Sequence, residues 1–79
     1  MSTFTIGRFI YKDRKETFGQ RLRRIRKEKK LTQTALGKKA GIPSHFISDY
    51  ELGKVFPKCH TLEWLCKALD VTASELLGF

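Results

Sequence analysis

The chain has 79 residues, which is enough for one domain, because two independent cores could not be buried from so short a chain. Its formal net charge is +8 and 41% of its residues are hydrophobic. No run approaches the roughly 18 apolar residues of a membrane span, and residues 1–10 lack the basic cluster and apolar stretch of a signal peptide. We therefore expect a single-domain cytoplasmic protein.

The basic charge is concentrated at the start of the chain. Residues 1–30 hold eleven of the sixteen Lys and Arg residues and three acids, whereas residues 31–79 hold five of each. A basic segment ahead of a neutral body favours an anionic partner, with DNA or RNA ahead of a membrane. A merely solvated basic face is the alternative that charge alone leaves open.

Residues 1–15 alternate loosely between apolar and polar side chains. This pattern is compatible with an extended arm, a short strand or a disordered leader, and it does not choose among them. We treat 1–15 as an N-terminal basic arm, followed by one helical domain at 16–79.

The first helix is expected at about 16–29, because Phe18, Leu22 and Ile25 recur at the spacing of one helical face. A second helix should follow Thr32, which is a good N-cap, and should end at Gly41, where a left-handed residue is needed.

The third helix should begin at Pro43 or Ser44 and end at Gly53. Its inner face is predicted to carry Phe46, Ile47 and Tyr50.

A loop at 53–57 is expected to lead into a fourth helix at about 58–69, which buries Leu62, Leu65, Cys66 and Leu69. Thr72 and Glu75 then form a capping box that begins a short fifth helix. The predicted fold is an all-α, compact five-helix bundle.

Cys59 and Cys66 both fall in the fourth helix, with Cα atoms roughly 10 Å apart at about 1.5 Å per residue. A disulfide tolerates at most about 7 Å, so we interpret both as small core residues. His60 and Cys59 together offer only two ligands, which are too few for a zinc site. Neither His60 nor His45 is accompanied by the nucleophile and the acid that an active site would need. We expect no metal, no cofactor and no enzymatic activity.

Two short helices joined by a glycine-containing turn are typical of a helix-turn-helix, here at about 33–52. Gly37 stands where the two helices cross closely, and Gly41 supplies the turn. Ile42, Ile47 and Tyr50 are predicted to form the buried wedge that fixes the angle between the helices.

The stretches RLRRIRKEKKLTQTALGKKAGI, FISDYELGKVFPK and TLEWLCKALDVTASELL resemble the phage repressor and Cro-like helix-turn-helix domains of the Xre type. The resemblance covers about residues 18–77 and implies the lambda-repressor-like arrangement of helices. It also implies that the helix at about 44–52 enters the DNA major groove with its N-terminal end nearest the base edges.

The same resemblance implies roles for individual residues. The base-contacting positions are Ser44, His45, Ser48 and Asp49. The phosphate-contacting positions are Gln33, Lys54 and Lys58. Arg26 and Glu51 match a structural ion pair behind the motif. Alternatives are that Ser44 only caps a helix, that His45 only faces solvent and that Gln33 only begins a helix.

Two further sets of residues are expected to assist binding. Additional phosphate contacts are predicted for seven basic residues, Arg8, Lys12, Arg14, Lys15, Arg21, Arg23 and Arg24. A homodimer is predicted to be held by some of six apolar residues, Leu52, Val55, Phe56, Trp64, Leu77 and Phe79. Trp64 could alternatively be half-buried packing.

The leading hypothesis is a sequence-specific transcriptional regulator that binds a pseudo-palindromic site on double-stranded DNA as a dimer. A phage-type repressor, a restriction-modification controller, an antitoxin and the head of a longer repressor all remain open, although the lack of a long tail argues against a toxin-neutralising segment. The second hypothesis is a protein-interaction or architectural module of the same fold with only non-specific DNA binding.

Overall fold

The computed structural model describes residues 16–78. Residues 1–15, which include the predicted basic arm, and Phe79 lie outside the described residues. The described part contains five helices and no strand, so the prediction of an all-α bundle is confirmed. In chain order the helices are α2 (Phe18–Glu28), α3 (Gln33–Ala40), α4 (Ser44–Leu52), α5 (Cys59–Leu69) and α6 (Ala73–Leu77).

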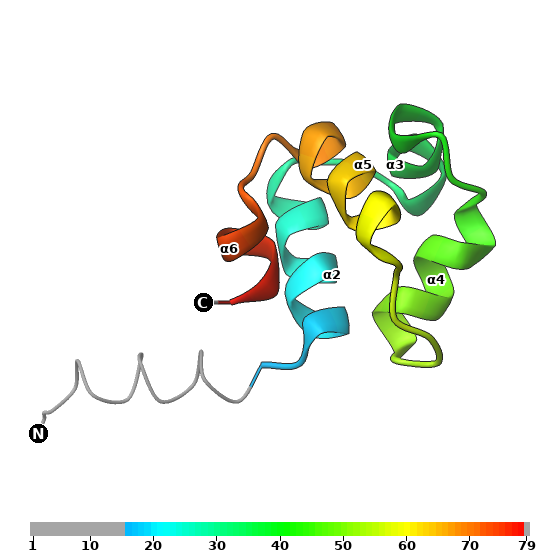
Figure 1. The fold of residues 1–79 in the computed structure, drawn as a ribbon. Coiled ribbons are helices and arrows are strands. Elements are labelled where there is room, and N and C mark those ends of the chain that lie inside the picture. The colour runs from blue at the N-terminus through cyan, green and yellow to red at the C-terminus, as the bar shows by residue number, and fades with distance from the viewer. Residues whose placement is uncertain (1–15, 79) are drawn as a thin grey trace, which may run out of the picture.

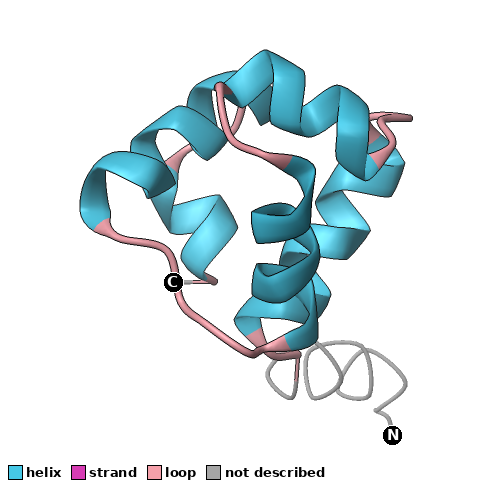
Figure 2. Cartoon of the chain, turned by 90° about the vertical axis from the view of Figure 1, so that its right-hand side faces the viewer, coloured by secondary structure: helices cyan, strands magenta, loops and turns pink. Residues whose placement is uncertain are grey.

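The helices surround one shared core. In Figure 1, α2 runs through the middle of the bundle with α6 beside it, while α3 and α4 lie together on the opposite side. Figure 2 shows that short loops join all of these helices. The largest side chains with less than 2% exposure come from every helix: Leu22, Leu36, Ile47, Leu65, Leu69 and Leu76. Each such burial contributes about 1.5–3 kcal/mol of hydrophobic stabilisation.

Capping hydroxyls and left-handed glycines mark four of the predicted helix ends. The hydroxyls of Thr32 and Thr72 accept hydrogen bonds from the first turns of α3 and α6, and Glu75 completes the predicted capping box. Gly41 and Gly53 end α3 and α4 with φ of 76° and 79°. The predicted starts and ends of these helices are therefore confirmed.

Two predicted core positions are wrong. Phe46 was placed on the inner face of α4 but is 42% exposed, because Ile47 and Tyr50 occupy the buried face and Phe46 lies about 100° around the helix from Ile47. Cys59 is exposed because it is the first residue of α5, ahead of the turn that packs on the core. Cys66 is partly buried, and this burial raises the pKa of its thiol.

Candidate nucleic-acid interface

The turn between α3 and α4 depends on a close backbone approach. A side chain at Gly37 would overlap the carbonyl oxygen of Ile42, and the Ile42 amide donates a 2.8 Å hydrogen bond to the Gly37 carbonyl. Ile42, Ile47 and Tyr50 are 6%, 0% and 8% exposed, which confirms the predicted wedge. The two helices therefore meet as a helix-turn-helix.

Buried charge anchors the C-terminal end of α4. Arg26 donates two hydrogen bonds to the Glu51 carboxylate, at 2.6 and 3.1 Å, and a third to the Leu31 carbonyl at 2.9 Å. The Gln33 amide donates to the same carboxylate at 3.0 Å. Both side chains of the ion pair are less than a tenth exposed. The predicted Arg26–Glu51 pair is confirmed, and Gln33 joins it.

Sequence reasoning missed a second anchor at this end. A side chain at Gly19 on α2 would overlap the carbonyl oxygens of Tyr50 and Glu51 on α4, so this glycine lets two helices far apart in sequence touch through their backbones. The sequence does carry a sign of this contact: Gly19 stands inside a predicted helix, where glycine costs about 1 kcal/mol relative to alanine and therefore indicates a close approach.

The N-terminal end of α4 has no side-chain cap and is exposed. Its N-cap is Pro43, and no side chain caps the helix. Ser44 is the first helical residue, so the alternative that it serves as the cap is wrong. Ser44 and His45 are exposed, and Ser48 and Asp49 are partly exposed. All four predicted base-contacting side chains therefore reach the surface of one short helix.

Exposed aromatic surface adjoins these polar groups. The His45 and Phe46 rings lie 4.4 Å apart between centroids, and the Phe46 and Tyr50 rings lie 6.5 Å apart in a stacked arrangement. Tyr50 is buried, so the accessible face of α4 carries the polar groups together with the rings of His45 and Phe46.

The basic residues predicted to contact phosphates differ in whether they already bind a carboxylate of this chain. Lys54, Lys58 and Arg23 are exposed, whereas Arg24 binds Glu16 at 2.8 Å and Glu28 at 3.2 Å. Arg8, Lys12, Arg14 and Lys15 lie outside the described residues.

Glu16 organises the two engaged arginines. Its carboxylate lies 3.4 Å from Arg21 Nε, and the Arg21 side chain is only 12% exposed. The hydrogen bond from Arg24 holds the pKa of Glu16 below its ordinary value, which favours the charged carboxylate that both arginines contact. A phosphate that bound Arg21 or Arg24 would have to share it with Glu16.

Most of the predicted dimer residues are on the surface. Leu52, Val55, Phe56 and Trp64 are 67%, 48%, 60% and 44% exposed, while Leu77 is partly buried and Phe79 is not described. The loop after α4 and the start of α5 thus present a large apolar surface beside the helix-turn-helix. Trp64 is about half buried and packs edge-on against His60, with ring centroids 5.0 Å apart, which agrees with the half-buried packing expected as an alternative as well as with an interface.

Two classes of site find no support in the described residues. Within 16–78, no three His, Cys, Asp or Glu side chains are grouped as a metal ion would require. None of the helices in this range has the length and apolar character to cross a membrane.

Comparison with known proteins agrees with this geometry. Residues 17–77 match a family model described as a helix-turn-helix domain. The immunity repressor protein of Bacillus phage phi105 is 40% identical over 62 residues, which are 78% of this chain and 43% of the repressor. The repressor protein C2 of Salmonella phage P22 is 37% identical over 62 residues, which are 78% of this chain and 29% of that protein. The chain thus spans less than half the length of these two relatives.

Two solved structures share the fold. The restriction-modification controller protein C.AhdI from Aeromonas hydrophila superposes with a TM-score of 0.74 at 33% identity, covering 77% of this chain and 92% of the controller. The P22 c2 repressor, solved in complex with a synthetic operator, gives a TM-score of 0.72 at 38% identity and covers 76% and 91% of the two chains. With the helix-turn-helix model matched over almost all of the described residues, this chain belongs to the helix-turn-helix domain family of phage repressors and Xre-type regulators.

Proposed function

We propose that this protein is a sequence-specific, double-stranded DNA-binding transcriptional regulator, a repressor or small controller, acting in the cytoplasm by binding rather than by catalysis. The observation that carries the proposal is the asymmetry of α4. Arg26, Glu51 and Gln33 hold its C-terminal end, while its N-terminal turn is exposed. A recognition helix that enters the major groove by its N-terminal end needs that end accessible, and the anchored C-terminal end would fix its orientation.

The base contacts are assigned by chemistry. Ser44 and Ser48 offer single hydrogen bonds that several bases can satisfy, His45 can donate to guanine N7 or O6, and Asp49 can accept from cytosine N4. We therefore expect His45 and Asp49 to contribute most of the base preference.

The phosphate contacts are assigned first to exposed cations. Lys54, Lys58 and Arg23 are accessible, and Gln33 has a second amide hydrogen beside the one given to Glu51. Arg8, Lys12, Arg14 and Lys15 supply further charge from the N-terminal segment, while Arg21 and Arg24 contribute less because Glu16 already binds them. With six to eight phosphates neutralised per dimer, log K should fall against log salt with a slope of about −5 to −7.

The proposal includes a homodimer. A single recognition module buries only about 600–1,000 Å² on DNA, which is little for specific binding at physiological salt. The exposed apolar surface at Leu52, Val55, Phe56 and Trp64 supports self-association, with Leu77 and Phe79 as further candidates. A two-fold dimer would read half-sites about 34 Å apart on one face of a pseudo-palindrome.

Binding selection from random duplex DNA tests the function. We expect an enriched pseudo-palindrome, because two copies of α4 would read the same bases in opposite orientations. The chain's two histidines provide a matched pair of variants: His45→Ala should relax one enriched position by about 1–3 kcal/mol, and His60→Ala should leave the selected sequence unchanged.

Other outcomes separate the alternatives. DNA binding without any enriched sequence would favour the interaction or architectural module, whose support is the same apolar surface. Equal effects of His45→Ala and His60→Ala would mean that α4 is not the helix that reads bases.

A further inference from the structure

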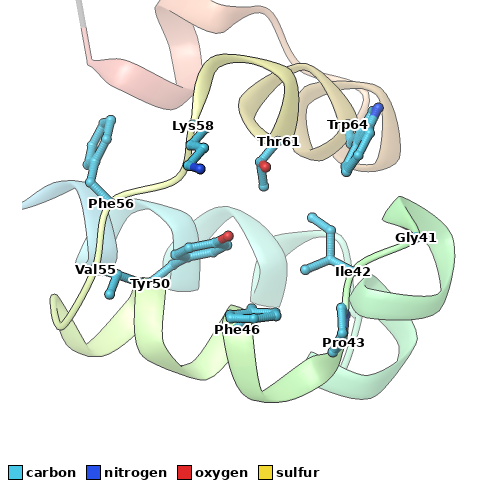
Figure 3. A pocket seen from close by; sticks show the side chains of 10 residues that line it. All are labelled: Gly41, Ile42, Pro43, Phe46, Tyr50, Val55, Phe56, Lys58, Thr61 and Trp64. Carbon is cyan, nitrogen blue, oxygen red and sulfur yellow. The ribbon is translucent and has the colours of Figure 1, made fainter.

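A mostly apolar groove, lined also by Lys58 and Thr61, runs between α4 and the start of α5, and we name it the α4–α5 groove. Its volume is about 410 Å³, and Figure 3 shows side chains from both helices and from the loop between them around it. Tyr50 belongs to the core, whereas Phe46, Val55, Phe56 and Trp64 are 42–60% exposed. Apolar side chains gathered around a concave surface are typical of a binding site.

We propose that residues 1–15 of the same chain occupy the α4–α5 groove in the absence of DNA. That segment carries five large apolar residues in addition to its cations: Phe4, Ile6, Phe9, Ile10 and Tyr11. An arm that only bound phosphates would need the cations alone, so DNA contact gives these apolar side chains no role. The groove offers the apolar surface that they lack.

The segment joins the body at the edge of the groove. The ring of Phe18, the first residue of α2, lies 4.7 Å from the ring of Phe56, which lines the groove. A chain spans at most about 3.3–3.6 Å per residue, so Tyr11, five residues before Glu16, reaches about 17 Å. A short tether also gives its segment an effective concentration of millimolar order, so even weak intrinsic affinity fills the groove.

A second copy of the chain is a less suitable occupant of the α4–α5 groove than residues 1–15. Two concave surfaces facing each other leave their hollows unfilled, whereas a stable interface buries about 800 Å² per partner at high packing density. In the absence of DNA, docking would take Val55, Phe56 and Trp64 out of the proposed dimer interface. Leu52 and Leu77, which do not line the groove, would remain available to the dimer.

Docking would connect the segment to the proposed function. Because α4 forms one side of the groove, bound Phe9 and Ile10 would hold Arg8 and Lys12 beside the helix that we propose reads DNA. This consequence rests on the proposed function, but the docking itself does not.

Trp64 provides the test, since it is the only tryptophan in the chain. Its fluorescence and its quenching by acrylamide are measured on the full chain without DNA, for the wild type and for the triple variant Ile6→Ser, Phe9→Ser, Ile10→Ser. We expect the variant's emission maximum to move to longer wavelength and its quenching constant to rise about twofold, because the indole loses an apolar cover. The control, Arg8→Gln with Lys12→Gln, removes charge but keeps the apolar side chains and should match the wild type.

Several outcomes would overturn the assignment. Equal quenching of wild type and triple variant at all protein concentrations would show that the segment does not cover Trp64. Protection that grows with protein concentration would place a second copy, or its N-terminal segment, in the groove. Circular dichroism confirms that the triple variant is folded, and because no DNA is present, a negative result leaves the DNA-binding proposal standing.

Discussion

The two ends of α4 are built differently. At its C-terminal end, Glu51 binds Arg26 and Gln33, the backbone packs against Gly19, and Gly53 closes the helix with a left-handed turn. At its N-terminal end, Pro43 provides no side-chain cap, and the first residues are exposed. One helix is thus fixed at one end and accessible at the other.

This difference explains how α4, which carries the acids Asp49 and Glu51 and no lysine or arginine, could serve the proposed DNA binding of a basic protein. Glu51 is neutralised inside the scaffold, so its charge does not face a phosphate. In the proposed complex, affinity for the DNA phosphates would come from lysines and arginines outside α4. The helix α4 would then be left to read bases.

Glu51→Ala should remove the ion pair that holds the C-terminal end of α4. Arg26, which is 8% exposed, would keep its charge without the carboxylate that compensates it. Removing one partner of such a buried pair costs about 3–5 kcal/mol, a large part of the stability of a small domain. Urea denaturation followed by circular dichroism measures the loss.

Glu28→Ala is the matched control, because it removes a carboxylate from an exposed pair with Arg24 whose side chains are 46% and 60% exposed. An exposed pair contributes about 0–1 kcal/mol. Similar losses for the two variants would mean that the network behind α4 is not a structural anchor.

Gly19→Ala tests the contact between α2 and the C-terminal end of α4. The test is whether the substitution raises or lowers the stability of the protein. Helix propensity alone predicts that alanine stabilises α2 by about 1 kcal/mol. The added methyl would overlap the carbonyls of Tyr50 and Glu51, and overpacking of this kind costs about 1–3 kcal/mol. We expect a lower denaturation midpoint, and a higher midpoint would contradict the close approach of α2 and α4.

Local patterns predicted most of the fold. The spacing of Leu22 and Ile25, the capping hydroxyls of Thr32 and Thr72, and the turn at Gly41 each follow from chemistry within a few residues, and all are confirmed. The Arg26–Glu51 pair joins residues 25 apart, and only the resemblance to repressor domains pointed to it.

Contacts between distant elements account for what was missed. Periodicity favours an inner position for Phe46 because it stands four residues before Tyr50, but the width of the buried face depends on where α5 and the loop lie. The engagement of Arg21 and Arg24 by Glu16 also depends on the chain turning back before α2. The base contacts remain predictions, since they depend on DNA as well as on the protein.

Asp49→Ala tests the accessible end and carries the smallest expected effect. Asp49 is partly exposed on α4, and its charge would lie near the DNA phosphates. Two unit charges about 4 Å apart interact by about 1 kcal/mol in water, so removing the acid should tighten general DNA binding roughly fivefold. Preference at one base pair should relax at the same time, because cytosine N4 would lose its acceptor. Affinity for random and for selected duplexes measures both effects.

Two further variants distinguish the effect of the position of Asp49 from the effect of the protein's net charge. Asp49→Asn removes the charge but keeps a side-chain oxygen, so it should tighten general binding while retaining part of the base preference. Asp70→Asn makes the same change at an exposed acid after α5, where asparagine tolerates the left-handed φ of 57°. If Asp70→Asn tightened binding as much as Asp49→Asn, overall charge would be the cause. If neither Asp49 variant changed affinity or preference, α4 would not approach DNA by its N-terminal end.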